Sequence, residues 1–145
     1  MSQKSALLIY YGENIMLKEI RVKTSSRVEF KNIDSEIQKV IDESKVNSGV
    51  CHIFVPHTTA AVTINENADP NVVRDIISET NKIIPFNDNY THLEGNAAAH
   101  IKASLIGQSE TVFIENGRMI LGTWQSIFFC EFDGPRTRKV YVKIT

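Results

Sequence analysis

The sequence predicts a single α+β domain over residues 1–145, with a mainly antiparallel sheet and about three helices. Three segments combine an apolar helical period or an alanine-rich run with residues that start or stop helices. Short β-branched and aromatic runs are interspersed with them, as in mixed folds with antiparallel sheets. Asn116-Gly117 joins two of these runs, and this pair readily takes the positive φ angles of a two-residue hairpin turn. The length suits one domain, to which residues 1–16 form an N-terminal extension.

The first third of the chain predicts two strands and a helix. Residues 17–23 alternate imperfectly between the two faces of a strand, and residues 28–30 begin a second strand. Asp34 is the expected N-cap of a helix that runs to about residue 46, with Gly49 beyond its end. The apolar stripe of this helix consists of Ile37, Val40 and Ile41.

The next two strands differ in their patterns. Residues 50–56 are mostly apolar, which predicts a strand buried on both faces. In residues 60–67, Val62 and Ile64 point to the core, and Glu66 is in register with them. A carboxylate in line with core residues is costly unless it is paired, hydrogen-bonded or bound to a metal. Glu66 is therefore a site candidate, unless the strand ends before it and the side chain turns into solvent.

Two further helices follow. Asp69-Pro70 is an N-cap followed by proline at the first helical position, and the helix is expected to end before Pro85. Its apolar stripe consists of Val72, Val73, Ile76, Ile77, Ile83 and Ile84. Asn96 is expected to cap the next helix with its side-chain oxygen, ahead of the small residues Ala97, Ala98 and Ala99, and Gly107 is expected to end it.

The C-terminal part predicts a hairpin and two strands. The hairpin pairs residues 109–115 with residues 118–121, and the last strand covers residues 139–144 after a Gly-Pro turn. Residues 126–132 form a strand that is apolar on both faces. Such a strand needs cover on both sides, and in so small a domain we expect a homo-oligomer to supply it.

Composition and charge narrow the classes of protein. Lys and Arg number 16 against 17 Asp and Glu, so the chain lacks the overall positive field of nucleic-acid-binding proteins. Cys51 and Cys130 lie in apolar runs without metal-binding spacing, which predicts buried, reduced thiols. The apolar run at residues 6–11 is too short for a signal peptide or a membrane span. We therefore expect a cytoplasmic protein that binds neither nucleic acid nor membrane.

Residues with useful chemistry collect at the ends of the predicted elements, where scaffolds place functional groups. The candidate catalytic residues are His57, Glu66, His92 and His100. The candidate residues for binding a substrate or an anion are Thr58, Thr59, Asn96, Trp124, Gln125, Asp133 and Arg136. The unsatisfied N–H groups at a helix N-terminus and an arginine fork favour phosphate, and an indole can stack on a heteroaromatic ring. The sequence thus predicts a site for a small phosphorylated metabolite.

The histidines allow two kinds of chemistry. His92 and His100 together with Glu66 could bind a divalent metal, zinc or magnesium, with an open position for water or substrate. Their spacing matches no zinc signature such as HExxH. Alternatively, His57 or His100 acts as a general acid or base near neutral pH without a metal. For each histidine taken singly, a structural or surface role also remains open.

Four ordered motifs resemble the YjbQ family, also called UPF0047. They are His57-Thr-Thr-Ala-Ala-Val-Thr-Ile-Asn-Glu-Asn67; His92 with Asn96 and His100; Gly117 followed by Gly122-Thr-Trp-Gln125; and Asp133-Gly-Pro-Arg136. The resemblance runs from about residue 17 to the end of the chain. It implies a compact α+β fold that assembles as a homotrimer, polar sites near the subunit boundaries, and a weak thiamine-phosphate synthase activity.

Three functions are therefore under consideration. The first is an enzyme that acts on a phosphorylated heterocycle and has thiamine-phosphate synthase activity, as the resemblance implies. The second is a non-catalytic trimer that binds a metabolite or a metal. The third is a hydrolase whose zinc ion, held by histidines, activates a water molecule.

Overall fold

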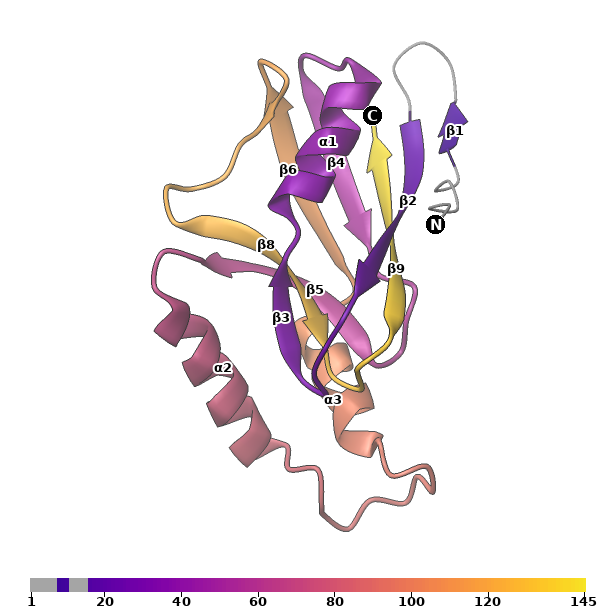
Figure 1. The fold of residues 1–145 in the computed structure, drawn as a ribbon, viewed down its shortest axis with the longest axis vertical. Coiled ribbons are helices and arrows are strands. Elements are labelled where there is room, and N and C mark those ends of the chain that lie inside the picture. Colours follow the sequence, from indigo (N-terminus) through magenta and orange to yellow (C-terminus); the bar gives the residue numbers. More distant parts are fainter. Residues whose placement is uncertain (1–7, 11–15) are drawn as a thin grey trace.

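The computed structural model describes residues 8–10 and 16–145, and these residues form two antiparallel sheets and three helices (Figure 1). The larger sheet has the strand order β1-β2-β9-β4-β6-β7, and the smaller has the order β3-β8-β5. The strands are β1 (Leu8–Tyr10), β2 (Met16–Lys23), β3 (Glu29–Asn32), β4 (Gly49–Phe54), β5 (Ala60–Glu66), β6 (Ser109–Glu115), β7 (Arg118–Met119), β8 (Gln125–Glu131) and β9 (Thr137–Ile144). The helices are α1 (Asp34–Ser44), α2 (Pro70–Ile83) and α3 (Ala97–Ile106). The predicted α+β class with a mainly antiparallel sheet and three helices is confirmed.

The N-terminal extension predicted at residues 1–16 lies largely outside the described residues. Within it, β1 pairs with β2 in antiparallel register. None of the helices in the described part of the chain combines the length and apolar character needed to cross a membrane.

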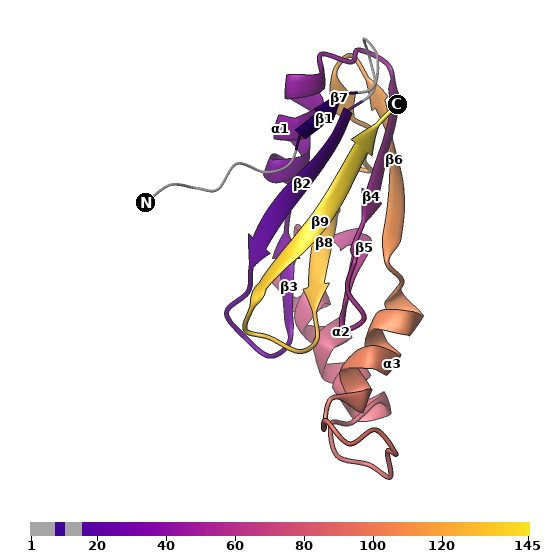
Figure 2. The same ribbon diagram turned by 90° about the vertical axis from the view of Figure 1, so that its right-hand side faces the viewer.

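Two apolar cores stabilise the fold. The first core lies between the six-stranded sheet on one side and α1 with the three-stranded sheet on the other. The second core lies on the opposite face of the three-stranded sheet and includes Ala99 and Ala103 of α3. Figure 2 shows α1 beside the upper part of the large sheet and α3 at the lower end of the molecule. The order of layers is therefore large sheet, first core, small sheet and α1, second core, α3.

Strand β8 lies between the two cores. Ile127 and Phe129 face the first core, whereas Phe128 and Cys130 face the second. The prediction of a strand apolar on both faces is confirmed. The expectation that a second subunit must cover it is wrong, because the large sheet and α3 of the same chain cover its two faces.

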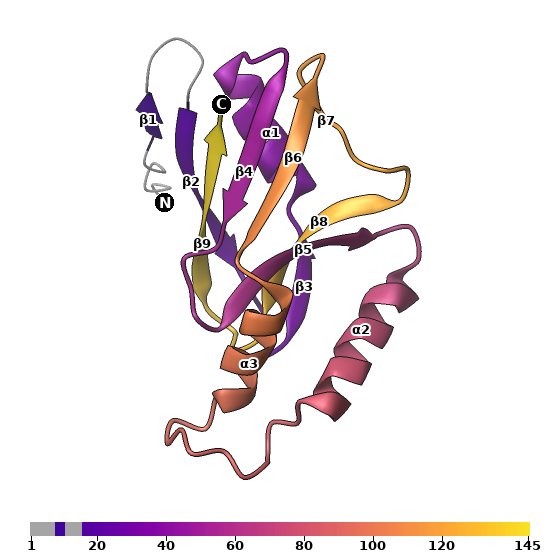
Figure 3. The same ribbon diagram turned by 180° about the vertical axis from the view of Figure 1, so that it is seen from behind.

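Strand β4 differs from its predicted pattern. Cys51 and Ile53 are buried, but His52 and Phe54 are exposed, so the strand alternates and is not buried on both faces. The reason is that β4 belongs to the six-stranded sheet, whose outer face carries no helix along most of its length in the described chain (Figure 3). Composition suggested two buried faces, but the outer face of this sheet is not covered within one chain.

The N-terminal caps of the helices agree only in part with the sequence predictions. Asp69 Oδ1 accepts a hydrogen bond from Asn71 N–H (2.9 Å), so it caps α2 as predicted. Asp34, in contrast, is the first residue of α1 and not its cap; Asp34 Oδ1 accepts a hydrogen bond from Ile127 N–H (2.7 Å) and so ties α1 to β8. The side chain of Asn96 makes no cap on α3.

The hairpin and the two thiols agree with the sequence predictions. Asn116 (φ 51°) and Gly117 (φ 72°) both have positive φ in the turn that joins β6 to β7. The second strand of this hairpin is shorter than expected and ends at Met119. Cys51 and Cys130 are buried free thiols, and burial raises the pKa of Cys51 to about 12.

Helix α2 stands apart from the body of the molecule (Figure 1). None of its residues is buried, and Ile83 of its predicted apolar stripe is 69% exposed. Its register is amphipathic as predicted: the other five residues of the stripe are partly buried, and Val73 packs against the second core. Tertiary packing of α2 is thus partial, and Asp69 and Pro70 add local capping at its start.

The position of Phe129 gives a test of the fold. Phe129 is fully buried on the core face of β8, so Phe129→Ala should lower the free energy of unfolding by about 3–5 kcal/mol through lost burial and a cavity. Phe113, 66% exposed on the outer face of β6, is the matched control, and Phe113→Ala should cost less than about 1 kcal/mol. Equal losses in urea denaturation would contradict the proposed order of layers.

Candidate functional site

Four chain segments meet at one end of the two sheets, and we call them the basal cluster. They are the β2–β3 turn (24–28), the β4–β5 loop (55–59), the segment that leads into α3 (92–100), and the β8–β9 turn with its flanking residues (131–138). Backbone hydrogen bonds link them: Phe132 N–H donates to Thr59 O (3.2 Å), and Gly134 N–H donates to Arg27 O (3.0 Å). The cluster gathers most of the site residues predicted from the sequence.

A buried ion pair lies beneath the basal cluster. Arg138 Nε donates to both carboxylate oxygens of Glu131 (2.9 and 3.1 Å), and both side chains are almost entirely shielded from solvent. Thr24 Oγ1 donates to Glu131 Oε1 (2.8 Å), and Arg138 Nη2 donates to Thr59 Oγ1 (2.8 Å). The pair therefore ties three of the four segments together.

Hydrogen bonds decide the charge of Glu131. Burial by itself would raise the pKa of this carboxyl. Hydrogen bonds from Arg138, Thr24 and the backbone N–H of Asp133 outweigh the burial and hold the pKa of Glu131 below its ordinary value. The carboxylate is thus ionised at neutral pH and balances the buried guanidinium.

Gly134 permits the close approach of the β2–β3 and β8–β9 turns. A Cβ atom at this position would lie 2.3 Å from Ser26 O and 2.8 Å from Glu131 Cγ. A side chain at residue 134 would therefore push apart two of the segments that the ion pair holds together.

His57 contacts the start of β9. Its Nε2 accepts a hydrogen bond from the backbone N–H of Lys139 (2.9 Å), so in the neutral ring the proton is on Nδ1. Burial lowers the pKa of His57, and the positive charge of Arg138 lowers it further. At neutral pH the ring is therefore uncharged and offers Nδ1–H as a donor. This geometry suits a residue that positions a ligand better than one that removes its proton.

Asn96 and Asp133 connect α3 to the β8–β9 turn. Asn96 Nδ2 donates to Asp133 Oδ2 (2.9 Å), which fixes the orientation of the amide because that carboxylate oxygen can only accept. The amide oxygen, Asn96 Oδ1, is buried without a donor among the described residues. Arg136 is exposed and donates to the backbone oxygen of Asp133 (2.9 Å) and to its Oδ2 (3.2 Å). The role of Asn96 is therefore to position Asp133 and not to cap the helix.

His92 and His100 lie next to each other at the start of α3. Their rings are nearly perpendicular, with centroids 5.2 Å apart, and Glu94 Oε2 lies 3.8 Å from His92 Nε2. His100 is half-buried, while His92 is exposed. Two of the three residues predicted as metal ligands are therefore in contact within one chain.

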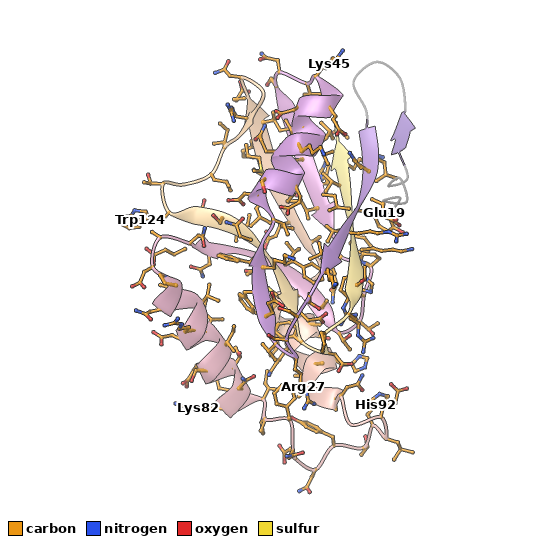
Figure 4. All side chains as sticks on the ribbon, viewed as in Figure 1. Glu19, Arg27, Lys45, Lys82, His92 and Trp124 are labelled. Carbon is orange, nitrogen blue, oxygen red and sulfur yellow. The ribbon has the colours of Figure 1, made fainter. Side chains whose placement is uncertain are left out.

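The remaining predicted residues form a second group away from the basal cluster. Glu66 is opposite Gln125 in the register of β5 and β8, and Trp124 comes just before Gln125. Glu66 is at the far end of β5 from Thr59, roughly 20 Å away at the usual rise per strand residue. Figure 4 shows Trp124 and His92 on opposite sides of the molecule. Within one chain, the predicted site is thus divided in two.

The second group is open to solvent. Glu66 is half-buried and follows the predicted register with Val62 and Ile64, so it does not carry the cost of a fully buried carboxylate. Gln125 Oε1 accepts a hydrogen bond from Gly122 N–H (2.8 Å), which gives this side chain a role in the turn. Trp124 is 66% exposed, and Thr58 of the basal cluster is also exposed.

The three residues predicted as metal ligands do not converge in a single chain. Over residues 8–10 and 16–145, no group of three or more His, Cys, Asp or Glu side chains is close enough to hold a metal ion. His92 and His100 are neighbours, but Glu66 belongs to the second group. One chain therefore does not supply the complete predicted ligand set.

Glu131, Arg138 and Thr24 were not predicted as part of the site. A signal for two of them was present in the sequence. Glu131 is on the same face of β8 as Ile127 and Phe129, and Arg138 is on the same face of β9 as the buried residues of that strand. The argument that selected Glu66 applies equally to these charged residues.

Comparison with protein families places the chain among known sequences. Residues 18–145 match the family described as UPF0047 protein YjbQ-like. The chain is 57% identical over 129 residues to a UPF0047 protein of Methanocaldococcus jannaschii, covering 89% of this chain and 94% of the relative. It is 49% identical over 130 residues to the UPF0047 protein YugU of Bacillus subtilis, covering 89% and 98%.

Solved structures share the fold. An uncharacterized conserved protein of the YjbQ/UPF0047 family from Clostridium acetobutylicum superposes with a TM-score of 0.86 at 54% identity, over 88% of this chain and 98% of that chain. A YbjQ-like protein of unknown function from Sulfolobus solfataricus superposes with a TM-score of 0.85 at 31% identity, over 90% and 96%. The fold described above is thus similar to experimental structures along nearly their whole length.

The ion pair gives a test of how the basal cluster is held. Glu131→Gln leaves the Arg138 guanidinium buried without a counter-charge, so the free energy of unfolding should fall by about 3–5 kcal/mol. Because the folded-state pKa of Glu131 is lowered, its contribution is complete above the ordinary value of 4.5 and is lost as the pH falls through the folded-state pKa. The variant should therefore lose less stability than the wild type between pH 5 and pH 3.

Urea denaturation at several pH values measures both effects. Exposed Glu115, which accepts a hydrogen bond from Ser48, is the matched control, and Glu115→Gln should change stability by less than about 1 kcal/mol. A Glu131→Gln variant as stable as this control would show that the pair does not hold the cluster together.

Proposed function

Because the chain belongs to the YjbQ-like UPF0047 family, we propose that it is an enzyme that acts on a phosphorylated heterocycle in the basal cluster, and that formation of thiamine phosphate is among its reactions. The observation that carries this proposal is the arrangement around the start of α3. Neutral His57 belongs to a segment that the buried ion pair ties in place through Thr59, whereas the His92–His100 pair and the uncapped N-terminus of α3 belong to the segment that Asn96 joins to Asp133.

The cluster provides recognition for two parts of such a ligand. The N-terminus of α3 and the Nδ1–H of His57 suit a phosphate, because both present N–H donors. Asn96 Oδ1 is a buried acceptor that a ring amino group or hydroxyl of the ligand would satisfy. Arg136 is exposed beside them, and ligand phosphate would compete with Asp133 for its guanidinium.

The proposed reaction joins a pyrimidine diphosphate to a thiazole phosphate. The thiazole nitrogen forms a bond to the methylene carbon of the pyrimidine, and the carbon–oxygen bond to the diphosphate breaks with both electrons going to the oxygen. The protein's part is to hold the two rings in line and to stabilise the negative charge of the departing diphosphate. We assign the charge stabilisation to Arg136 and the N-terminus of α3, and proton transfer at the leaving group to His100.

The divided site supports a second proposal, that the active form is a homotrimer. Several apolar side chains are exposed on one chain, including Trp124 beside Glu66, Ile83 on α2, and Phe54 and Phe113 on the outer face of the large sheet. Apolar surface distributed in this way is typical of subunit interfaces. A neighbouring subunit that contributes Glu66 and Trp124 to the basal cluster would reunite the predicted site and complete the metal ligand set with His92 and His100.

Each of two other functions is favoured by one structural observation. A non-catalytic metabolite-binding protein is favoured by the pairing of Arg136 with Asp133, because binding then needs only an exchange of partners. A zinc hydrolase is favoured by the adjacency of His92 and His100, which a bound zinc ion would use as ligands.

Turnover measurements test the enzyme proposal. Purified protein given the pyrimidine diphosphate and the thiazole phosphate should form thiamine phosphate above a protein-free control. His100→Ala should lower kcat about 10²- to 10⁴-fold, as expected for loss of a proton-transfer group. Arg136→Ala should mainly raise KM.

His52 is the matched histidine control, since it is exposed on β4 outside the basal cluster. His52→Ala should keep wild-type turnover. Absence of product, or equal rates for His100→Ala and His52→Ala, would contradict the enzyme proposal. Substrate binding without turnover would leave the binding function, and chelator-sensitive release of phosphate from ester substrates would indicate the zinc hydrolase.

Native mass spectrometry tests the trimer and the metal together. We expect the mass of three chains with one divalent metal ion per subunit. His92→Ala and His100→Ala should lose the metal, whereas His52→Ala should keep it. A monomeric mass would refute the trimer, and a trimer of metal-free mass in all samples would refute the metal site.

A further inference from the structure

Lys102 is an unusual residue on α3. It is only 1% exposed, although a lysine is almost never fully buried unless it is paired. Its Nζ donates a hydrogen bond to Asn81 Oδ1 near the end of α2, and it lies 4.3 Å from the centre of the Phe86 ring. An ammonium group has three donors, and one amide oxygen and one ring face leave its charge without a counter-ion.

A second cation shares the same ring. The guanidinium carbon of Arg27 lies 3.8 Å from the centre of the Phe86 ring. The ion pairs formed by the described residues include neither Arg27 nor Lys102. Burial lowers the pKa of Lys102, and the positive charge of Arg27 lowers it further. Two like charges therefore lie at one ring, and no carboxylate among the described residues pairs with either of them.

Aromatic contact alone does not balance this arrangement. The stabilisation of a cation by a ring face is smaller than the cost of burying a charge without a counter-ion. A ligand with two negative charges would neutralise both groups at once. Phosphate also suits the planar fork of Arg27 and the point charge of Lys102.

We infer that Lys102 and Arg27 form a phosphate-binding site at the Phe86 ring, between α3, the end of α2 and the β2–β3 turn. Figure 4 places Arg27 between the end of α2 near Lys82 and the segment that carries His92. Arg27 is exposed and Phe86 half-buried, so the phosphate enters from the side of Arg27. Arg27 lies in the β2–β3 turn of the basal cluster, and its backbone oxygen accepts a hydrogen bond from Gly134 N–H, but the site stands whether or not that cluster catalyses a reaction.

The ligand is either free inorganic phosphate or the phosphate group of a monoester, and thermal unfolding distinguishes them. The probes are inorganic phosphate and phenyl phosphate, each compared with sodium chloride at equal ionic strength. At least one probe should raise the wild-type Tm by several degrees. An equal effect of both identifies a site for the phosphate group itself, and an effect of phenyl phosphate alone identifies a site for an aromatic monoester.

Lys102→Met and Arg27→Gln should each weaken the probe's effect at least tenfold in the concentration required. Lys82→Met, an exposed lysine on α2, is the matched control and should keep it. In phosphate-free buffer, Lys102→Met should have a Tm equal to or above that of the wild type, because an unpaired buried charge is replaced by an apolar side chain of similar length.

Three results would overturn the inference. The first is no rise in Tm with either probe. The second is a rise that Lys102→Met and Arg27→Gln both leave unchanged. The third is a rise that only Arg136→Gln abolishes, because the phosphate then binds at Arg136 and not at the Phe86 ring. If Lys102→Met fails to fold, the response of Arg27→Gln decides the question.

Discussion

The ion pair of Glu131 and Arg138 is the constraint on which the basal cluster depends. A carboxylate and a guanidinium are buried together only if their remaining hydrogen-bonding groups are satisfied, and here Thr24, Thr59 and the N–H of Asp133 satisfy them. Each of these partners comes from a loop or turn at the same end of the sheets. The charge balance inside the core thus requires those segments to converge, and His57 and Asp133, the partner of Asn96, belong to the segments that converge.

Much of the fold follows from local signals in the sequence. The Asn116-Gly117 turn, the Asp69-Pro70 helix start and the apolar alternation of β9 depend on a few neighbouring residues, and all three were predicted. The wrong predictions concern side chains whose hydrogen-bond partners are set by tertiary contacts. Asp34 and Asn96 were expected to cap helices, but their side chains bond instead to distant partners on β8 and in the β8–β9 turn. Asp34 still accepts a hydrogen bond from a backbone N–H, but on β8, and Asn96 donates to the carboxylate of Asp133 instead of accepting from the start of its own helix.

The candidate site was predictable in part for a related reason. Residues with useful chemistry were predicted to collect at element ends, and several of them do lie together: His92 contacts His100, and Asn96 donates a hydrogen bond to Asp133. The sequence could not show that Glu66 and Trp124 lie at the other end of β5, because strand direction decides which loops share an edge. Glu131 and Arg138 were not predicted, although the alternation of β8 and β9 places both charged side chains on core faces.

Helix α2 links the two proposed ligand sites. It has no buried residue, and Asn81 near its end bonds to buried Lys102. Residues 84–91 connect α2 to His92, so the position of α2 affects the segment that carries this histidine. A phosphate at Lys102 and Arg27 would neutralise repulsion where α2, α3 and the β2–β3 turn meet, and would favour the arrangement in which His92 lies against His100. Phosphate bound at Lys102 and Arg27 would therefore affect the geometry of the histidine pair through α2, a helix that has no fully buried residue.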